Sequence, residues 1–93
     1  MTARDIVIGL DIGTTSTIAV AVRLPDQILA VASRPVSLSS PQPGWAEEDP
    51  AEWWKNSVAV LREVLAEIDP AAVAGLCATG MLPAVVLLDA DGN

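Results

Sequence analysis

The chain of 93 residues lacks several residue types from which enzyme and metal sites are commonly built. It has no histidine, which removes most zinc sites and Cys–His nucleophiles. A single cysteine, Cys77, excludes an internal disulfide and fits a reducing compartment. Phenylalanine and tyrosine are absent and the only aromatic residues are three tryptophans, so aliphatic side chains must fill most of the core.

Positive charge and long apolar runs are also scarce. Only 5 Lys and Arg side chains stand against 12 Asp and Glu, which gives a net charge of −7. An acidic chain is poorly suited to bind a nucleic-acid backbone or an anionic membrane. The apolar runs over 6–10 and 84–88 are far shorter than the roughly 20 residues that cross a bilayer, and 6–10 is too short for a signal-peptide core. We therefore expect a soluble, cytoplasmic protein with no nucleic-acid or membrane partner.

The first third of the chain has the patterns of three strands. Residues 5–10 form a short β-branched run, typical of a strand buried on both faces. Residues 17–23 alternate, with Ile18, Val20 and Val22 on one face. A turn at 25–26 leads to a third strand over 28–34. The short connections predict an antiparallel meander.

A helix is predicted over 50–68, after an irregular Ser-, Pro- and Gly-rich connection. Asp49 can cap its N-terminus, Pro50 suits the first helical position, and Glu52 can complete a capping box. Helical spacing groups one apolar face: Ala51, Trp54, Val58, Leu61, Leu65 and Ile68. We therefore expect Trp54 in the core. Trp53 lies off this face and is expected to cover the connection.

Two more strands are predicted, over 73–79 and 84–88. Small residues in the first of them, such as Ala74 and Ala78, would let the helix pack closely, and Cys77 is expected to be a buried small residue. Residues 89–93 have the composition of a hairpin turn, because Asp-Gly suits a type I′ turn. No strand follows to pair with 84–88, so we expect these residues to be part of a longer protein.

The strongest candidate site is the D-I-G-T-T-S segment that begins at Asp11, between the first two strands. A carboxylate at a strand end can hold Mg²⁺, often through water. Gly13 lets backbone N–H groups approach a phosphate, and Thr14, Thr15 and Ser16 add hydroxyl donors. An ordinary hairpin turn favours the same residue types, so the segment alone leaves both interpretations open.

The wider pattern resembles a known family. A strand, then D-I-G-T-T-S, then an alternating strand is similar to the first phosphate-binding motif of the sugar kinase, actin and heat-shock ATPase superfamily. The G-W-A-E-E-D-P segment over 44–50, followed by Trp53 and Trp54, resembles the N-terminal domain of FGGY carbohydrate kinases, particularly xylulokinase-like and gluconokinase-like members. The segment over 79–84 resembles the sugar-side loop of that family. The resemblance spans nearly the whole chain.

The resemblance implies an α/β, ribonuclease-H-like (actin-like ATPase) fold, here incomplete: a mixed sheet with an antiparallel meander and a crossover helix of right-handed connection. It also implies a sugar or polyol substrate and the cofactors ATP and Mg²⁺. Asp11 would lie near the metal, residues 13–16 near the phosphates, and Gly80, Met81 and Leu82 near the sugar. The family's catalytic base lies beyond residue 93, so no catalytic residue is assigned. The isolated chain is expected to be inactive.

Three positions depart from the family pattern. Ile18 stands where Lys or Arg is usual, and the sugar loop has Met81 and Ala84 where Gln and Gly are usual. The other classes considered are an actin-like ATPase activator or chaperone-type module, a non-enzymatic interaction domain and a small stand-alone structural protein. Expected partners are the sugar, the rest of the kinase chain and another copy of the chain.

Overall fold

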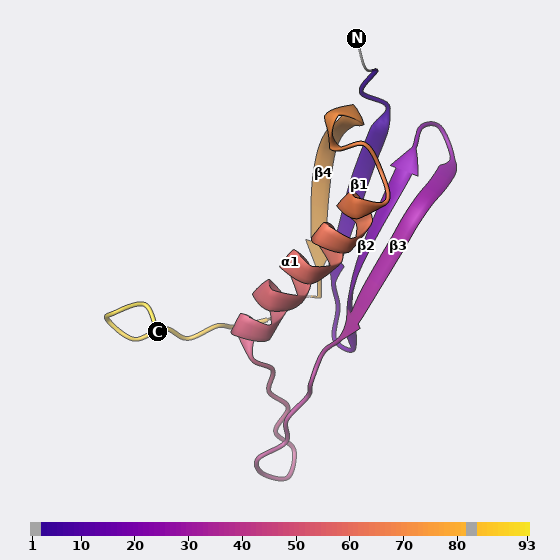
Figure 1. Ribbon diagram of the computed structural model, residues 1–93. Coiled ribbons are helices and arrows are strands. Elements are labelled where there is room, and N and C mark those ends of the chain that lie inside the picture. The colour runs from indigo at the N-terminus through magenta and orange to yellow at the C-terminus, as the bar shows by residue number, and fades with distance from the viewer. Residues whose placement is uncertain (1–2, 82–83) are drawn as a thin grey trace.

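The computed structural model describes residues 3–81 and 84–93. Four strands and one long helix make up the structure (Figure 1). In chain order the elements are β1 (Ile6–Ile12), β2 (Ser16–Arg23), β3 (Gln27–Pro35), α1 (Pro50–Ala66), the short 3-10 helix η1 (Pro70–Ala72) and β4 (Val73–Gly80).

The strands form one mixed sheet in the order β3-β2-β1-β4. β1 pairs antiparallel with β2, and β2 with β3, while β4 lies parallel to β1. The predicted meander and the parallel strand after a crossover helix are confirmed. In Figure 1 α1 lies in front of the sheet, and the chain passes from β3 on the right to β4 on the left, with both strands pointing down. That crossover is right-handed, as expected.

The core lies between α1 and one face of the sheet. β1 was expected to be buried on both faces, but its burial alternates: Ile6, Ile8 and Leu10 are buried and face α1, and the residues between them are only half-buried. β2 contributes alanines at 19 and 21, which are fully buried and let α1 approach closely. From α1 the core receives Val60 and Val64, both 0% exposed. The opposite face of the sheet is left without a covering element among the described residues.

The buried face of α1 is not the predicted one. Its buried residues are Asn56, Ser57, Val60 and Val64, so the face is rotated by about 100°, one residue step, from the predicted stripe. Two of these residues are polar, and both are hydrogen-bonded: the Asn56 amide donates to the Pro35 carbonyl and the Ser57 hydroxyl to the Trp53 carbonyl. Satisfied polar groups can be buried at little cost. The expectation that Trp54 lies in the core is therefore wrong, because its side chain is 74% exposed.

Asp49 caps the start of α1 as predicted, but the second predicted capping residue, Glu52, does not take part. The Asp49 carboxylate accepts a hydrogen bond from the Ala51 N–H at 2.9 Å, and Pro50 occupies the first turn. Glu52 does not complete a capping box. Its Oε1 accepts from the Ser37 N–H at 2.8 Å instead, which ties the chain leaving β3 to the first turn of the helix.

Replacing Asp49 by alanine is expected to lower the free energy of unfolding by about 1 kcal/mol, because one helix N–H loses its acceptor. Urea unfolding followed by tryptophan fluorescence measures this. Asp49→Ser should restore most of the loss, since serine also caps, and the exposed neighbour Glu47→Ala serves as the control. An equal loss in the control would assign the effect to local charge rather than to the cap.

The connection between β3 and α1 is closed by its own backbone. Ser39 and Glu47 exchange two N–H to carbonyl hydrogen bonds, each 2.8 Å long. Gly44 lies between them with φ of 83°, in the region that favours glycine. The Trp45 side chain is 51% exposed, and the backbone pairing provides the closure.

β4 lies outside the cover of α1, which packs mainly across β2 and β3. Residues 74–80 are consequently exposed, including Cys77, which corrects both the expected burial of that thiol and the expected packing of α1 against the small residues of this strand.

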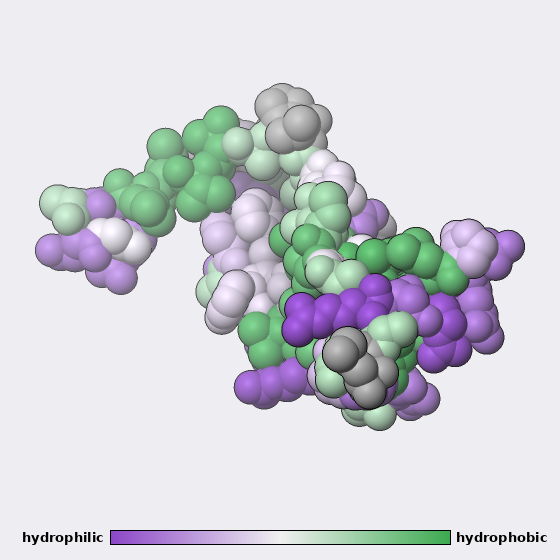
Figure 2. Space-filling view, turned by 90° about the horizontal axis from the view of Figure 1, so that it is seen from above, coloured by the Kyte–Doolittle hydropathy of each residue, from purple (hydrophilic) through white to green (hydrophobic). Residues whose placement is uncertain are grey.

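The strand predicted over 84–88 is also absent from the structure. These residues form no strand, and the described chain offers no partner for their backbone. They leave the body as an apolar segment, which Figure 2 shows standing apart from the sheet and helix. Val85 and Leu87 are 82% and 87% exposed. The predicted turn over 89–93 is present, but Gly92 has the positive φ, whereas Ala90 and Asp91 do not, so it is not type I′.

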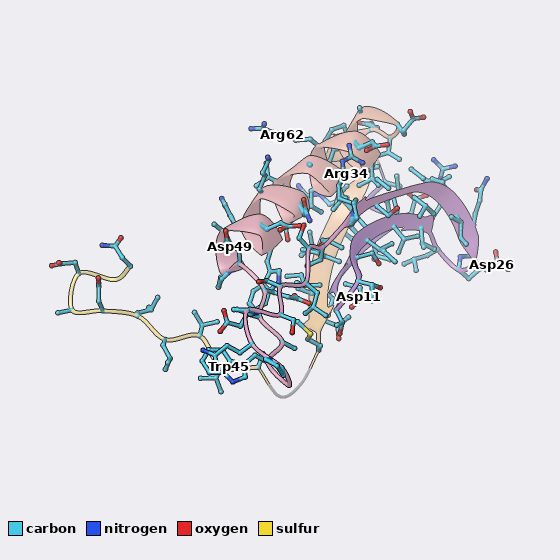
Figure 3. All side chains as sticks on the ribbon, turned by 90° about the horizontal axis from the view of Figure 1, so that it is seen from below. Asp11, Asp26, Arg34, Trp45, Asp49 and Arg62 are labelled. Atoms are coloured by element: carbon cyan, nitrogen blue, oxygen red, sulfur yellow. The ribbon has the colours of Figure 1, made fainter. Side chains whose placement is uncertain are left out.

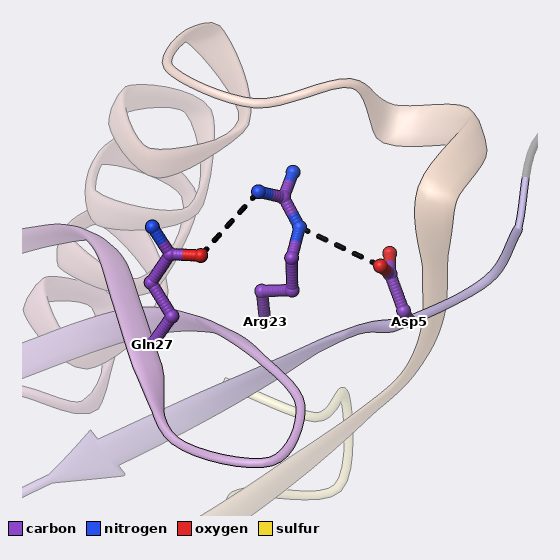
Figure 4. Close-up of polar contacts among 3 residues, drawn as sticks. All are labelled: Asp5, Arg23 and Gln27. Carbon is purple, nitrogen blue, oxygen red and sulfur yellow. Dashed lines mark hydrogen bonds and ion pairs between the residues drawn. The ribbon is translucent and has the colours of Figure 1, made fainter.

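The end of the sheet where β2 meets β3 carries a small polar cluster. The Arg23 guanidinium lies 3.5 Å from the Asp5 carboxylate and 3.5 Å from the Gln27 side-chain oxygen (Figure 4). Both charged side chains are more than 40% exposed, so this ion pair contributes little stability. Within the described residues, no helix is both long and apolar enough to span a bilayer.

Candidate functional site

The candidate site lies at the opposite end of the sheet, where β1 turns into β2. The ends of β3 and β4 and the first turn of α1 reach the same end (Figure 1). Asp11 is the last residue but one of β1 and is exposed. Because Leu10 faces α1, Asp11 lies on the opposite face of the sheet. Its cross-strand neighbours are Ile18 of β2 and Thr79 of β4. Figure 3 looks onto this end from below, with Asp26 well away from Asp11.

The loop between β1 and β2 is tight. The Gly13 N–H donates to the Ser16 carbonyl at 2.9 Å, so this amide serves the hairpin itself. A Cβ on Gly13 would lie 3.0 Å from that same carbonyl oxygen, so a larger residue would force the backbone of the turn to shift. Thr14 and Thr15 form the exposed tip, and no backbone hydrogen bond from either N–H is found within the described part of the chain. Ser16 is half-buried and begins β2 opposite Pro35.

The sugar-loop residues lie beside this hairpin. Gly80 is the parallel partner of Ile12, and the Met81 N–H donates to the Ile12 carbonyl at 3.3 Å. The Thr14 hydroxyl approaches the Met81 sulfur at 3.1 Å. The structure thus brings the predicted phosphate residues and two of the three predicted sugar residues together at one end of the sheet. Leu82, the third, lies outside the described residues.

A cavity of about 650 Å³ opens on the α1 side of the hairpin. Thr14 and Met81 line it from below, and Leu38, Glu48 and Trp53 from the connection and α1. The exposed segment after β4 supplies a further wall, with Ala84, Val85, Val86 and Leu87. A smaller cavity of about 190 Å³ lies against it and shares Trp53, Met81 and Ala84, with Ile12 as its floor. Asp11 lines neither cavity, because it points to the other face. The hairpin therefore separates an exposed carboxylate from a largely apolar hollow.

Trp53 and Glu48 are joined across the start of α1. The Trp53 indole N–H donates to Glu48 Oε2 at 2.8 Å. The other carboxylate oxygen, Oε1, is buried and has no hydrogen-bond partner among the described residues. The sequence predicted Trp53 as a cover for the connection and did not indicate this pair. Its only sequence signal is a spacing that places the two residues on either side of the Asp49 cap.

The charges near the hairpin limit the chemistry that this chain supplies. Among residues 3–81 and 84–93, no three His, Cys, Asp or Glu side chains gather as a metal site. Asp11 is a single carboxylate, which suits Mg²⁺ held mostly by water and phosphate oxygens rather than by a protein cage.

The comparisons with known proteins agree with one another. Residues 6–93 match the profile described as "FGGY family of carbohydrate kinases, N-terminal domain". Xylulose kinase from Rhodospirillum rubrum has a crystal structure with 64% sequence identity and a TM-score of 0.87, over 95% of this chain and 18% of that one. Gluconate kinase from Lactobacillus acidophilus gives 25% identity and a TM-score of 0.86 with the same coverage. Glycerol kinase from Citrifermentans bemidjiense is 34% identical over 89 residues.

That glycerol kinase alignment covers 94% of this chain and 18% of the relative, so the chain spans less than a fifth of the length of the kinases it matches. The profile match includes both the D-I-G-T-T-S hairpin and the G-W-A-E-E-D-P connection. The mixed sheet with its crossover helix is the corresponding part of the actin-like ATPase fold. The chain belongs to the FGGY family of carbohydrate kinases and corresponds to part of its N-terminal domain.

Proposed function

We propose that this chain is part of the first lobe of an ATP- and Mg²⁺-dependent kinase that transfers the γ-phosphoryl group to a hydroxyl of a sugar or polyol. One observation carries the proposal. An exposed carboxylate, Asp11, stands at the end of β1 beside a two-threonine tip whose amides have no partner in the described chain. Such a tip offers donors to phosphate oxygens without displacing a hydrogen bond of the fold.

Each residue has a separate part in this proposal. The Asp11 carboxylate orients water or metal on the open face of the sheet. Gly13 keeps the hairpin narrow, and Thr14, Thr15 and Ser16 direct N–H and hydroxyl groups toward phosphate. Gly80, Met81 and Leu82 are assigned to sugar binding. Mg²⁺, when bound with ATP, neutralises charge on the transferred group.

Ile18 is the cross-strand neighbour of Asp11. A Lys or Arg side chain at this position would place a cation close to the phosphates. Without that cation, electrostatic stabilisation must come from the metal and from the rest of the protein. Transfer to the sugar hydroxyl also needs a general base, and no residue of this chain is assigned that role. The proposal therefore concerns the kinase as a whole, with the remainder of the chain supplying the base and the second lobe.

The test is a coupled assay of the full-length kinase with Mg²⁺-ATP and a panel of sugars. Xylulose is the first substrate to try, because the xylulose kinase of Rhodospirillum rubrum is 64% identical to this chain; gluconate and glycerol follow from the other relatives. We expect ADP release that depends on one of these compounds. ATP hydrolysis independent of every sugar would favour an ATPase activator or chaperone-type module, and no nucleotide binding would favour an interaction domain.

The 93-residue chain alone is expected to show no sugar-dependent ATP turnover, because the base and the second lobe are missing. The same coupled assay measures this at matched concentration. Sugar-dependent ATP turnover above that of a buffer blank, and absent in Asp11→Ala, would contradict the proposal that the rest of the kinase supplies the base and the second lobe.

A further inference from the structure

We propose that Glu48 accepts a hydrogen bond from a hydroxyl group of the sugar or polyol substrate, and that Trp53 positions it to do so. The inference rests on the proposed function and adds a specificity-determining residue to it. It starts from the Glu48 carboxylate in the wall of the 650 Å³ cavity.

The two oxygens of this carboxylate are in different states. Oε2 is held by the Trp53 indole N–H at 2.8 Å, a charge-assisted hydrogen bond that fixes the side chain. Oε1 is shielded from solvent and has no partner among the residues that the structure describes. A buried carboxylate oxygen without a donor is costly, and the cost disappears when a donor arrives. The carboxylate is therefore prepared for one more hydrogen bond.

The surroundings of Glu48 select the chemistry of that donor. Trp53, Met81 and Leu38 supply apolar walls, which suit the C–H face of a sugar. Glu48 forms no ion pair among the described residues, where the ion pairs are Arg23–Asp5 and Arg34–Glu63. A second acidic residue, Glu47, also lines the cavity. Two acidic residues beside apolar walls suit a neutral hydroxyl donor, whereas an anionic substrate group would be repelled.

Trp53 acts through Glu48 and is a positioning residue. Its ring lines both cavities, and its indole N–H determines which carboxylate oxygen is left for the substrate. The backbone of Trp53 is held in turn, because its carbonyl accepts from the Ser57 hydroxyl at 2.7 Å. Trp54, the next residue, is 74% exposed and lines neither cavity, which makes it a matched control.

The experiment measures steady-state kinetics of the full-length kinase with its best sugar and with analogues that each lack one hydroxyl. We expect Glu48→Gln to raise KM for the sugar by about 10- to 100-fold, the loss of one hydrogen bond to a charged acceptor, while KM for ATP stays unchanged. The analogue that lacks the hydroxyl bound by Glu48 should bind weakly to the wild type. Its KM should rise no further in Glu48→Gln. Trp53→Phe should raise KM for the sugar in the same direction, and Trp54→Phe and Glu67→Gln should not.

Three outcomes would overturn the inference while leaving the proposed function in place. They are an unchanged KM for the sugar in Glu48→Gln, an equal loss for every analogue, or a lowered melting temperature with unchanged kinetics. The last would assign Oε1 to a donor elsewhere in the protein. If the wild type phosphorylates no sugar in the panel, the proposed function itself fails, and the inference with it.

Discussion

Replacing Asp11 by alanine in the full-length kinase is expected to lower kcat by about 100- to 1,000-fold, with little change in KM for the sugar. The exposed carboxylate at the end of β1 is the one acidic side chain that the hairpin presents on its open face. In the proposed mechanism it holds the metal that neutralises charge on the transferred phosphoryl group, an interaction that matters most in the transition state. A coupled assay at saturating sugar and Mg²⁺-ATP measures the effect.

Asp26→Ala is the matched control for this experiment. Asp26 is also exposed, but it lies in the turn between β2 and β3, well away from the hairpin (Figure 3). Its replacement should leave kcat unchanged. Asp11→Asn should be nearly as slow as the alanine variant, because the amide keeps the shape and loses the charge. Wild-type kcat in both Asp11 variants would reject the role of this carboxylate and the interpretation of the hairpin as a phosphate site.

Ile6→Ala is expected to lower the free energy of unfolding by about 2–5 kcal/mol, the largest stability effect that we anticipate. Ile6 is 1% exposed and packs in the layer between the sheet and α1. Alanine would leave a cavity in a core that, among the described residues, is built from small and aliphatic side chains. Urea unfolding followed by tryptophan fluorescence measures the change.

Ile28→Ala makes the same chemical change at the start of β3, where the side chain is 66% exposed. Its cost should stay below about 1 kcal/mol, since little apolar surface returns to water. A cost for Ile6→Ala no larger than that of Ile28→Ala would contradict the placement of the core beneath α1.

The sheet could be predicted from the sequence because its signals are local. Alternation over 17–23, the turn residues at 25–26 and the Asp49 cap each depend on a few neighbouring residues, and the structure agrees with all three. The candidate site was predicted by motif rather than by geometry. The sequence placed Asp11 at a strand end, but it did not indicate that the Gly13 N–H is used inside the hairpin.

Most of the failures concern packing between distant segments. Trp54 fits the most apolar stripe of α1, yet the helix turns a face with Asn56 toward the sheet, because the Pro35 carbonyl offers that amide a partner. Cys77 lies in an apolar strand, and its exposure follows from the position of α1 over β2 and β3. Periodicity identifies a face, but it does not identify the element that the face meets.

The alternation of β1 has a consequence for how insertions and deletions would act. Asp11 and Ile12 are neighbours in the chain, yet one faces open solvent and the other forms the floor of the apolar hollow. A slip of β1 by a single position against β2 and β4 would exchange them, bringing an acid into the cavity and an aliphatic group to the proposed phosphate site. The proposed separation of the metal site from the sugar site therefore depends on the pairing register of a seven-residue strand.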